Sequence, residues 1–217
     1  MNILIISDNQ FIKENMIRIF NNHNIQNTIT TSKDINLNNI DSNYDLIISA
    51  HCKKIFPPKL VNSFRCINIH PGLNPYNRGW FPQAFSLINK LPVGATIHEI
   101  DEKLDHGPII FQEEVEIESI DTSFSLYNKI INKEIELFER NFNSIINNTY
   151  KTFIPKNAGN LNFKKDFDKL CKLSLDNVDT LENHINILKA LTFDKYKNAY
   201  FIDSNGDKIY LSLKLSK

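Results

Sequence analysis

The sequence has few cysteines, no long apolar run and no excess of either charge, and each shortage excludes a class of protein. Its three cysteines, Cys52, Cys66 and Cys171, are odd in number and do not show metal-ligand spacing, as is typical of reduced thiols in a cytoplasmic protein. No apolar stretch approaches the roughly 18 residues that a membrane-spanning helix needs. Residues 1–7 lack the basic segment of a secretory signal peptide. We therefore expect a cytoplasmic chain with no membrane partner.

Charge is balanced, since Lys and Arg together number 25 and Asp and Glu also number 25. Proteins that grip a nucleic acid along its phosphates normally carry a basic excess, so a nucleic acid polymer is not an expected partner. A small anionic ligand stays compatible with this balance, because a few well-placed cations can hold a pyrophosphate. No Gly-x-Gly-x-x-Gly motif follows the first apolar run, which disfavours a nicotinamide cofactor.

Continuous apolar runs in the first half of the chain predict strands that are buried on both faces. The expected strands are 3–7, 45–50, 65–69, 93–100 and 109–117, with a polar surface segment over 32–44. Strands that alternate with helices are typical of an α/β fold. We therefore predict a Rossmann-like, mostly parallel sheet with flanking helices.

Helical periodicity accompanies these strands. A helix over 10–22 should bury Phe11, Met16, Ile19 and Phe20, and another helix is expected over about 79–89. Beyond the last strand, apolar residues step by three and four along one face of a long helix that Asp121 or Thr122 can cap. The residues of this stripe are Phe124, Tyr127, Ile131, Ile135, Phe138, Phe142 and Ile145.

The character of the chain changes after about residue 150, where polar, lysine-rich sequence begins. Asp179 and Glu182 show capping-box spacing before an apolar helix. Residues 200–202 and 209–211 flank an Asn-Gly pair, which predicts a hairpin with a type I′ turn. We predict two units: a main domain over 1–155, and a small helix and β-hairpin extension over 156–217.

The chemistry-bearing residues cluster after the third strand. Asn68 and His70 share one strand face, and Pro71-Gly72 ends that strand at the edge where open α/β folds bind ligands. Asp105 follows in a polar loop and can meet the imidazole. Asn can stabilise an oxyanion, His can move a proton, and Asp can orient the His, which suits direct attack of an amine on a carbonyl carbon. On the residues alone, a hydrogen-bonded loop histidine without a catalytic role is the favoured interpretation.

Three segments in this order and spacing resemble the folate-dependent formyltransferase superfamily. They are Asn68-Ile-His70, Arg78-Gly79 with Pro82, and Asp101-x-x-x-Asp105-x-Gly107. The resemblance implies that Asn68, His70 and Asp105 form the catalytic triad and that N10-formyltetrahydrofolate is the formyl donor. Residues 45–57 are similar to the strand and loop of the family's pterin pocket. The resemblance thus points to His51, Ile55, Phe56, Asp101 and Leu104 as folate-pocket residues.

Within the superfamily, residues 70–80 and the terminal segment resemble enzymes that formylate nucleotide-linked amino sugars, where the C-terminal part helps to form a dimer. The resemblance favours a dTDP-linked 4-amino-4,6-dideoxyglucose destined for a surface polysaccharide such as O-antigen, and a homodimer. Alternatives are a 3-amino sugar isomer, methionyl-tRNA formylation, and a folate- or nucleotide-binding module with an inactive site.

Further residues near the motif are candidates for substrate binding. Local cations suited to a pyrophosphate are Arg78, Lys53 and Lys54, of which Arg78 has the fork that matches phosphate oxygens. Asn9, at the mouth of the first strand, either contacts the nucleotide sugar or caps the next helix. Tyr76 and Trp80 either line the sugar or base pocket or belong to the core. His98, Glu99 and His106 lack metal-ligand spacing, so we expect no metal.

Overall fold

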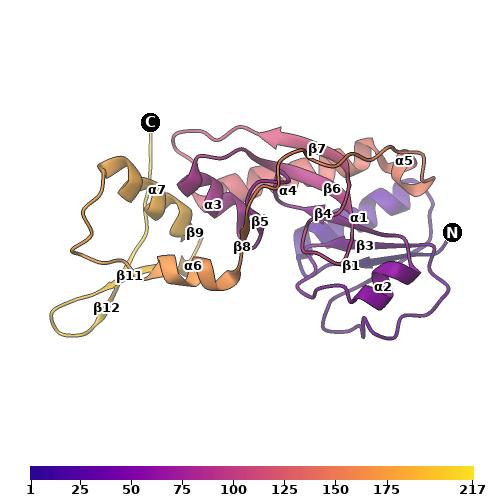
Figure 1. The fold of residues 1–217 in the computed structure, drawn as a ribbon, viewed down its shortest axis with the longest axis horizontal. Coiled ribbons are helices and arrows are strands. Elements are labelled where there is room, and N and C mark those ends of the chain that lie inside the picture. Colours follow the sequence, from indigo (N-terminus) through magenta and orange to yellow (C-terminus); the bar gives the residue numbers. More distant parts are fainter.

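The computed structural model describes all 217 residues and is built on one six-stranded sheet (Figure 1). The strands follow the order β2-β1-β3-β4-β6-β7, in which β1 to β4 run parallel and β6 and β7 are antiparallel to their neighbours. This arrangement confirms the predicted α/β fold with a mostly parallel sheet. The six strands are β1 (Ile3–Ile6), β2 (Asn27–Thr30), β3 (Leu46–Ala50), β4 (Cys66–His70), β6 (Val93–Glu99) and β7 (Ile109–Val115).

Helices cover both faces of this sheet. The helices of the main body are α1 (Gln10–Asn22), α2 (Pro58–Ser63), α3 (Pro82–Asn89), α4 (Ser123–Arg140) and α5 (Phe142–Ile146). Helices α1, α4 and α5 pack their apolar stripes against one face, and α2 covers part of the other. Asp121 and Thr122 were the two predicted caps of α4. Thr122 is the N-cap, and its side chain accepts a hydrogen bond from Ser125 N. No helix combines the length and the apolar character needed to cross a membrane.

Several local predictions were wrong in detail. Ile12 rather than Phe11 faces the core, since the Phe11 side chain is 40% exposed. The long helical stripe is interrupted at Asn141, which separates α4 from α5, and its first member, Phe124, is 37% exposed. Strand β2 was not predicted, because its sequence Asn-Thr-Ile-Thr is polar and it lies at the sheet edge.

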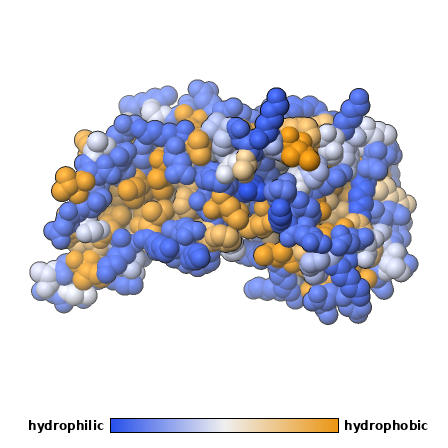
Figure 2. All heavy atoms as spheres, viewed as in Figure 1, coloured by the Kyte–Doolittle hydropathy of each residue, from blue (hydrophilic) through white to orange (hydrophobic).

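The chain beyond β7 and α5 does not build a core of its own. Its elements are β8 (Leu161–Asn162), α6 (Lys164–Cys171), α7 (Leu181–Leu191), β9 (Thr192–Phe193), β10 (Tyr196–Lys197), β11 (Ala199–Ile202) and β12 (Lys208–Leu211). Phe167, Leu191 and Ala199 join one buried cluster with residues of α3, β6 and α4. Strand β8 also pairs in parallel with β5 (Arg78–Gly79), which ties the extension to the main body. Figure 2 shows apolar side chains gathered in a hollow over this part of the molecule.

The terminal hairpin forms as predicted, with Tyr200 opposite Tyr210, but its turn differs from the prediction. A type I′ turn needs positive φ at both Asn205 and Gly206, and only Gly206 has it, at +87°. The Asp203 carboxylate instead accepts from the backbone N–H groups of Asn205 and Asp207 across a longer loop. Helix α7 likewise begins one residue later than expected, with Thr180 rather than Asp179 as its N-cap.

Candidate active site

The three residues predicted as catalytic meet at one edge of the sheet. Asn68 and His70 lie at the carboxyl end of β4, and Asp105 lies in the loop between β6 and β7. Asn68 Nδ2 donates to Asp105 Oδ1 at 3.1 Å, and His70 Nδ1 lies 3.6 Å from Asp105 Oδ2. Strand β4 is the last strand of the parallel half, so this is the sheet edge at which α/β folds bind ligands.

Backbone and side-chain contacts fix the position of Asp105. Its φ of +47° is uncommon for a residue that carries a Cβ atom. Asn74 Nδ2 donates to its carbonyl oxygen at 2.9 Å, and Gly79 N donates to its Oδ2 at 3.0 Å. The strained backbone is therefore held from both sides, and the carboxylate is left only 10% exposed.

The enclosed site sets the charge of both partners. Burial alone would raise the pKa of the Asp105 carboxyl, but His70, His98 and the Gly79 N–H together outweigh it and bring the pKa to about 2. Burial lowers the pKa of His70 to about 4 in spite of the nearby Asp105. At neutral pH the site therefore contains a carboxylate beside an uncharged imidazole.

His98 belongs to the same cluster, although the sequence alone indicated only an ordinary strand residue. Its Nε2 lies 3.2 Å from Asn68 Nδ2, and its Nδ1 lies 2.7 Å from the Glu99 carbonyl oxygen. His98 of β6 lies directly opposite Asn68 of β4. On its other side, the pairing of β6 with β7 shifts register between Ile97 and His98. The antiparallel register was the missing information, since nothing in the local sequence reveals it.

A cavity of about 680 Å³ opens in front of this cluster. Its walls contain every predicted site residue except Tyr76 and Arg78. Phe56 is buried at its floor and Ile55 is 73% exposed at its rim. The predicted members of the walls are Asn9, His51, Lys53, Lys54, Ile55, Phe56, Asn68, His70, Trp80, Asp101, Leu104 and Asp105.

Arg78 and Tyr76 lie outside the cavity walls. The Arg78 guanidinium donates to the Ala158 carbonyl oxygen at 3.3 Å, and its Nε is buried without a partner. Arg78 also pairs with Leu161 of β8, so its backbone serves to attach the extension. Its side chain therefore contacts the segment after α5 and does not line the cavity.

A second histidine–carboxylate pair lies in the cavity wall. His51 Nε2 is 2.7 Å from Oε2 of Glu134, which is fully buried, and Tyr127 OH is 3.2 Å from His51 Nδ1. Asn9 Nδ2 donates to the same hydroxyl at 2.8 Å. Asn9 Oδ1 accepts from Ile12 N, so Asn9 both caps α1 and lines the cavity. Tyr127 was predicted only as part of the core-facing stripe and Glu134 was not predicted at all, because the helical spacing does not show which residues the two side chains contact.

The extension supplies one wall of the cavity. Phe167, Phe193, Tyr196 and Asn198 all line it, although none was predicted as a site residue. Phe193 lies between Tyr127 and Tyr196, with ring centroids 5.4 and 6.0 Å away. Trp80 and Phe81 continue this aromatic surface, and Phe81 lies 4.2 Å from Phe167 between ring centroids. The cavity is therefore complete only when the C-terminal segment is folded.

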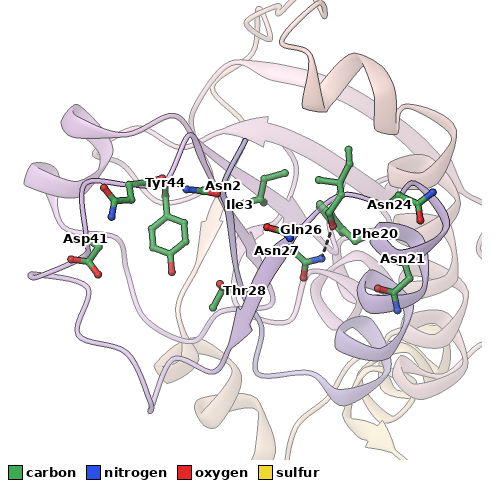
Figure 3. A pocket seen from close by; sticks show the side chains of 12 residues that line it. Asn2, Ile3, Phe20, Asn21, Asn24, Gln26, Asn27, Thr28, Asp41 and Tyr44 are labelled. Carbon is green, nitrogen blue, oxygen red and sulfur yellow. Dashed lines mark hydrogen bonds between the residues drawn. The ribbon is translucent and has the colours of Figure 1, made fainter.

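Another hollow, of about 830 Å³, lies at the opposite end of β1 and β2 (Figure 3). Its wall is dominated by amide side chains, including Asn2, Asn24 and Asn27, and Asn27 Nδ2 turns back to the Ile25 carbonyl oxygen. It contains no histidine, lysine or arginine, and Asp41 is its one carboxylate, so it lacks the histidine–carboxylate combination of the first cavity. Nowhere in the chain do three or more His, Cys, Asp or Glu side chains converge as a metal-ligand set.

Comparison with known proteins decides the family. The formyl transferase family matches residues 9–141, and the N-formyltransferase dimerization C-terminal domain matches residues 166–217. The chain belongs to the formyl transferase family. The resemblance predicted from Asn68, His70 and Asp105 is thereby confirmed, and the protein is a formyltransferase.

Individual relatives extend this result. This formyltransferase is 49% identical over 172 residues, 79% of its own length and 74% of the other, to dTDP-4-amino-4,6-dideoxyglucose formyltransferase of Mycobacterium bovis. It superposes on a 4-N formyltransferase from Francisella tularensis with a TM-score of 0.91 at 42% identity, over 100% of this chain and 98% of that one. A formyltransferase from Anoxybacillus kamchatkensis, solved with a UDP-linked formamido sugar and tetrahydrofolate, matches with a TM-score of 0.66 at 28% identity, over 78% of this chain and 89% of that one.

Proposed function

We propose that this formyltransferase moves the formyl group of N10-formyltetrahydrofolate to the amino group of a dTDP-linked amino-dideoxy sugar, with dTDP-4-amino-4,6-dideoxyglucose as the favoured acceptor. The formylated sugar would serve surface polysaccharide synthesis, as for an O-antigen. The observation that carries the proposal is that Asn68, His70 and Asp105 meet in one cavity of about 680 Å³. A relative that covers most of the chain at 49% identity bears this acceptor in its name.

One end of the cavity suits a pterin. Phe56, Ile100 and Leu104 provide apolar surface there, and the loop after His51 provides backbone groups. Asp8 keeps that loop in place, since its carboxylate accepts from Lys53 N at 2.7 Å and from Ser32 N at 3.0 Å. We assign this end to the folate, with His51, Ile55, Phe56, Asp101 and Leu104 as its pocket residues. The folate supplies a formyl group already activated for transfer.

The aromatic side of the cavity suits the nucleotide sugar. Trp80, Phe193 and Tyr196 offer ring faces to a base, and Lys53 and Lys54 lie exposed at the rim for a pyrophosphate. Lys53 has no ion-pair partner within the chain, whereas Lys54 Nζ contacts only the Ile35 carbonyl oxygen, at 3.4 Å. We keep Asn9 as a contact for the sugar. Arg78 and Tyr76 require movement of a side chain or loop before they can reach it.

His70 and Asp105 act together on the proton that the amine loses. A neutral imidazole beside a carboxylate can accept a proton, because the carboxylate stabilises the imidazolium that forms. The same proton then passes to the leaving nitrogen, so the pair returns to its starting state. His70, at the cavity wall, is also the group best placed to stabilise negative charge on the formyl oxygen.

We further propose that residues 1–155 form the catalytic unit and residues 156–217 the extension, that the extension forms a homodimer, and that the protein works in the cytoplasm without a nucleic acid polymer or membrane partner. The match of a dimerization domain to residues 166–217 supports the dimer. Light scattering or sedimentation at micromolar concentration would test it, and a monomer at all concentrations would contradict it.

The decisive experiment is an acceptor panel. The protein is incubated with N10-formyltetrahydrofolate and dTDP-linked 4-amino and 3-amino sugars, and mass spectrometry looks for the mass gain of one formyl group. Gain on the 4-amino sugar supports the proposal, and gain on the 3-amino isomer alone would move the acceptor. Gain only on charged initiator tRNA, or no gain on any acceptor, would refute the proposed reaction.

A further inference from the structure

The loop over residues 71–80 holds the Asp105 carboxylate in place. Asn74 Nδ2 donates to the Asp105 carbonyl oxygen at 2.9 Å, and Gly79 N donates to Asp105 Oδ2 at 3.0 Å. The Gly79 donor is a peptide N–H group, which cannot turn to another partner unless the backbone itself moves. The position of the carboxylate therefore depends on what holds the backbone of this loop.

The backbone on both sides of Gly79 pairs with β8 of the C-terminal extension (Figure 1). Arg78 N donates to the Asn160 carbonyl oxygen at 3.0 Å, and Trp80 N donates to the carbonyl oxygen two residues further along β8, at 2.9 Å. Successive peptide N–H groups of an extended strand point to opposite edges. Because both flanking N–H groups point to β8, the Gly79 N–H points the other way, to Asp105.

Two glycines allow the loop and the segment 158–162 to approach this closely. A Cβ atom at Gly159 would lie 1.9 Å from the Pro75 carbonyl oxygen, and one at Gly79 would lie 2.3 Å from the Asn162 carbonyl oxygen. Both residues have positive φ, +64° at Gly159 and +90° at Gly79, which also favours glycine. A larger residue at either position would push the two backbones apart.

Buried amide side chains hold the same contact. Asn77 is fully buried, and its backbone N–H donates to Asn160 Oδ1 at 2.8 Å. A peptide N–H can only donate, so the Asn160 amide has one orientation, and its Nδ2 donates to Asn77 Oδ1 at 2.6 Å. Asn77 Nδ2 in turn donates to Ser86 Oγ at 3.0 Å. Asn160 and Asn77 thus form a reciprocal pair at the centre of the contact.

We propose that the segment 158–162 is a positioning element of the reaction, which aims the Gly79 N–H at the Asp105 carboxylate through its pairing with the loop over 71–80. The extension then does more than supply a cavity wall and a dimer contact, because the catalytic unit over 1–155 depends on it for the placement of a catalytic group. The inference rests on the proposed function, since it takes Asp105 as a catalytic carboxylate.

The hydrogen bond from Gly79 also affects the charge of the site. Burial raises the pKa of the Asp105 carboxyl, whereas His70, His98 and the Gly79 N–H lower it. His70 and His98 are the titratable groups that face this carboxylate, at 3.6 and 3.7 Å, and the charge of Arg78 acts on His70. If the Gly79 N–H turned away, the carboxylate would attract a proton more strongly. The decline of kcat in acid would then begin at a higher pH.

Gly159→Ala tests the inference against a matched control. The added methyl group meets the Pro75 carbonyl oxygen, so the segment must move away from the loop. Gly206→Ala places the same residue at a similar positive φ, +87°, but with no atom within 4 Å, at the turn of the terminal hairpin. Steady-state assays with N10-formyltetrahydrofolate and dTDP-4-amino-4,6-dideoxyglucose measure kcat and KM over a series of pH values. Thermal melts show whether each variant is folded.

We expect Gly159→Ala to lower kcat about tenfold or more, as for the loss of a hydrogen bond to a charged group. The KM for the folate should stay close to the wild-type value, because the proposed folate end of the cavity lies on the loop after His51 and not on residues 71–80. The decline of kcat in acid should move to higher pH. Gly206→Ala should match the wild type in all three measurements.

Asn160→Ala is the second variant, because it removes both side-chain hydrogen bonds to Asn77 without adding bulk. If Gly159→Ala does not fold, Asn160→Ala decides: a similar loss of kcat supports the inference, and a wild-type kcat overturns it. A wild-type kcat in a folded Gly159→Ala protein, an equal loss in Gly206→Ala, or a lower kcat with an unshifted acid decline would each overturn it. A wild-type protein that formylates no amino sugar would instead overturn the proposed function.

Discussion

Two of the histidine–carboxylate pairs at the cavity, His51–Glu134 and His70–Asp105, have opposite geometries. His51 and Glu134 approach to 2.7 Å, and the carboxylate is fully buried behind the wall. His70 and Asp105 stay 3.6 Å apart, and Asp105 spreads its hydrogen bonds over Asn68 and Gly79. A tight pair with further partners holds two elements together, whereas a loose pair leaves a proton free to move. The contrast suggests that the first pair supports the site and that the second carries out the chemistry.

The largest expected effect concerns the loose pair. His70→Ala and Asp105→Asn should each lower kcat by at least two to three powers of ten, because charge in the transition state loses its partner. Steady-state assays with the amino sugar measure this, and circular dichroism checks the fold. If His70→Ala kept more than a tenth of wild-type turnover, His70 would have no role in the mechanism.

The tight pair should respond through stability instead. Glu134→Ala leaves His51 without its partner in a partly buried wall, and breaking such a pair costs about 3 kcal/mol or more. Urea denaturation with and without the substitution measures the loss, with Glu136→Ala on the exposed side of the same helix as control. If Glu134→Ala had the wild-type urea midpoint but no turnover, the roles would be reversed. His51 and Glu134 would then be the catalytic pair.

Acid should weaken the fold through His70. The pKa of His70 in the folded protein, about 4, lies below its usual value of 6.5, so the unfolded chain binds a proton first as the pH falls. The stability that this group contributes is complete above pH about 6.5 and is lost between there and pH about 4, by about 3 kcal/mol. His70→Gln should flatten the decline of Tm over this range, and thermal melts of the two proteins at a series of pH values measure it.

The smallest effect is expected for the hydroxyl that joins Asn9 to His51. Tyr127→Phe keeps the ring against Phe193 and removes two hydrogen bonds, which should cost about 1 kcal/mol of stability. A thermal melt would detect this as a shift of a few degrees. A change in kcat larger than tenfold would instead place the Tyr127 hydroxyl in the reaction, and the support network would no longer be separate from the chemistry.

The sequence allowed prediction of whatever depends on local pattern. Buried strands, the helical stripe and the spacing of Asn68, His70 and Asp105 are of this kind, and the family followed from that spacing. His98 was not found, because its role depends on the register between β4 and β6. Arg78 was placed at a pyrophosphate for its charge, whereas its contact with Ala158 depends on where the chain returns after α5. Aromatic residues of the extension were missed for the same reason.

Phe193 and Tyr196 line the cavity, but the ribosome synthesises them after all three catalytic residues. Asn68, His70 and Asp105 leave the exit tunnel long before these two aromatic residues, so a nascent chain has its catalytic groups while one wall of their cavity is missing. During that interval the apolar surface on α3, β6 and α4 that the extension will cover stays open to solvent. The unfinished chain is therefore the form of this protein most exposed to aggregation, and completion of the last segment ends that exposure and completes the cavity together.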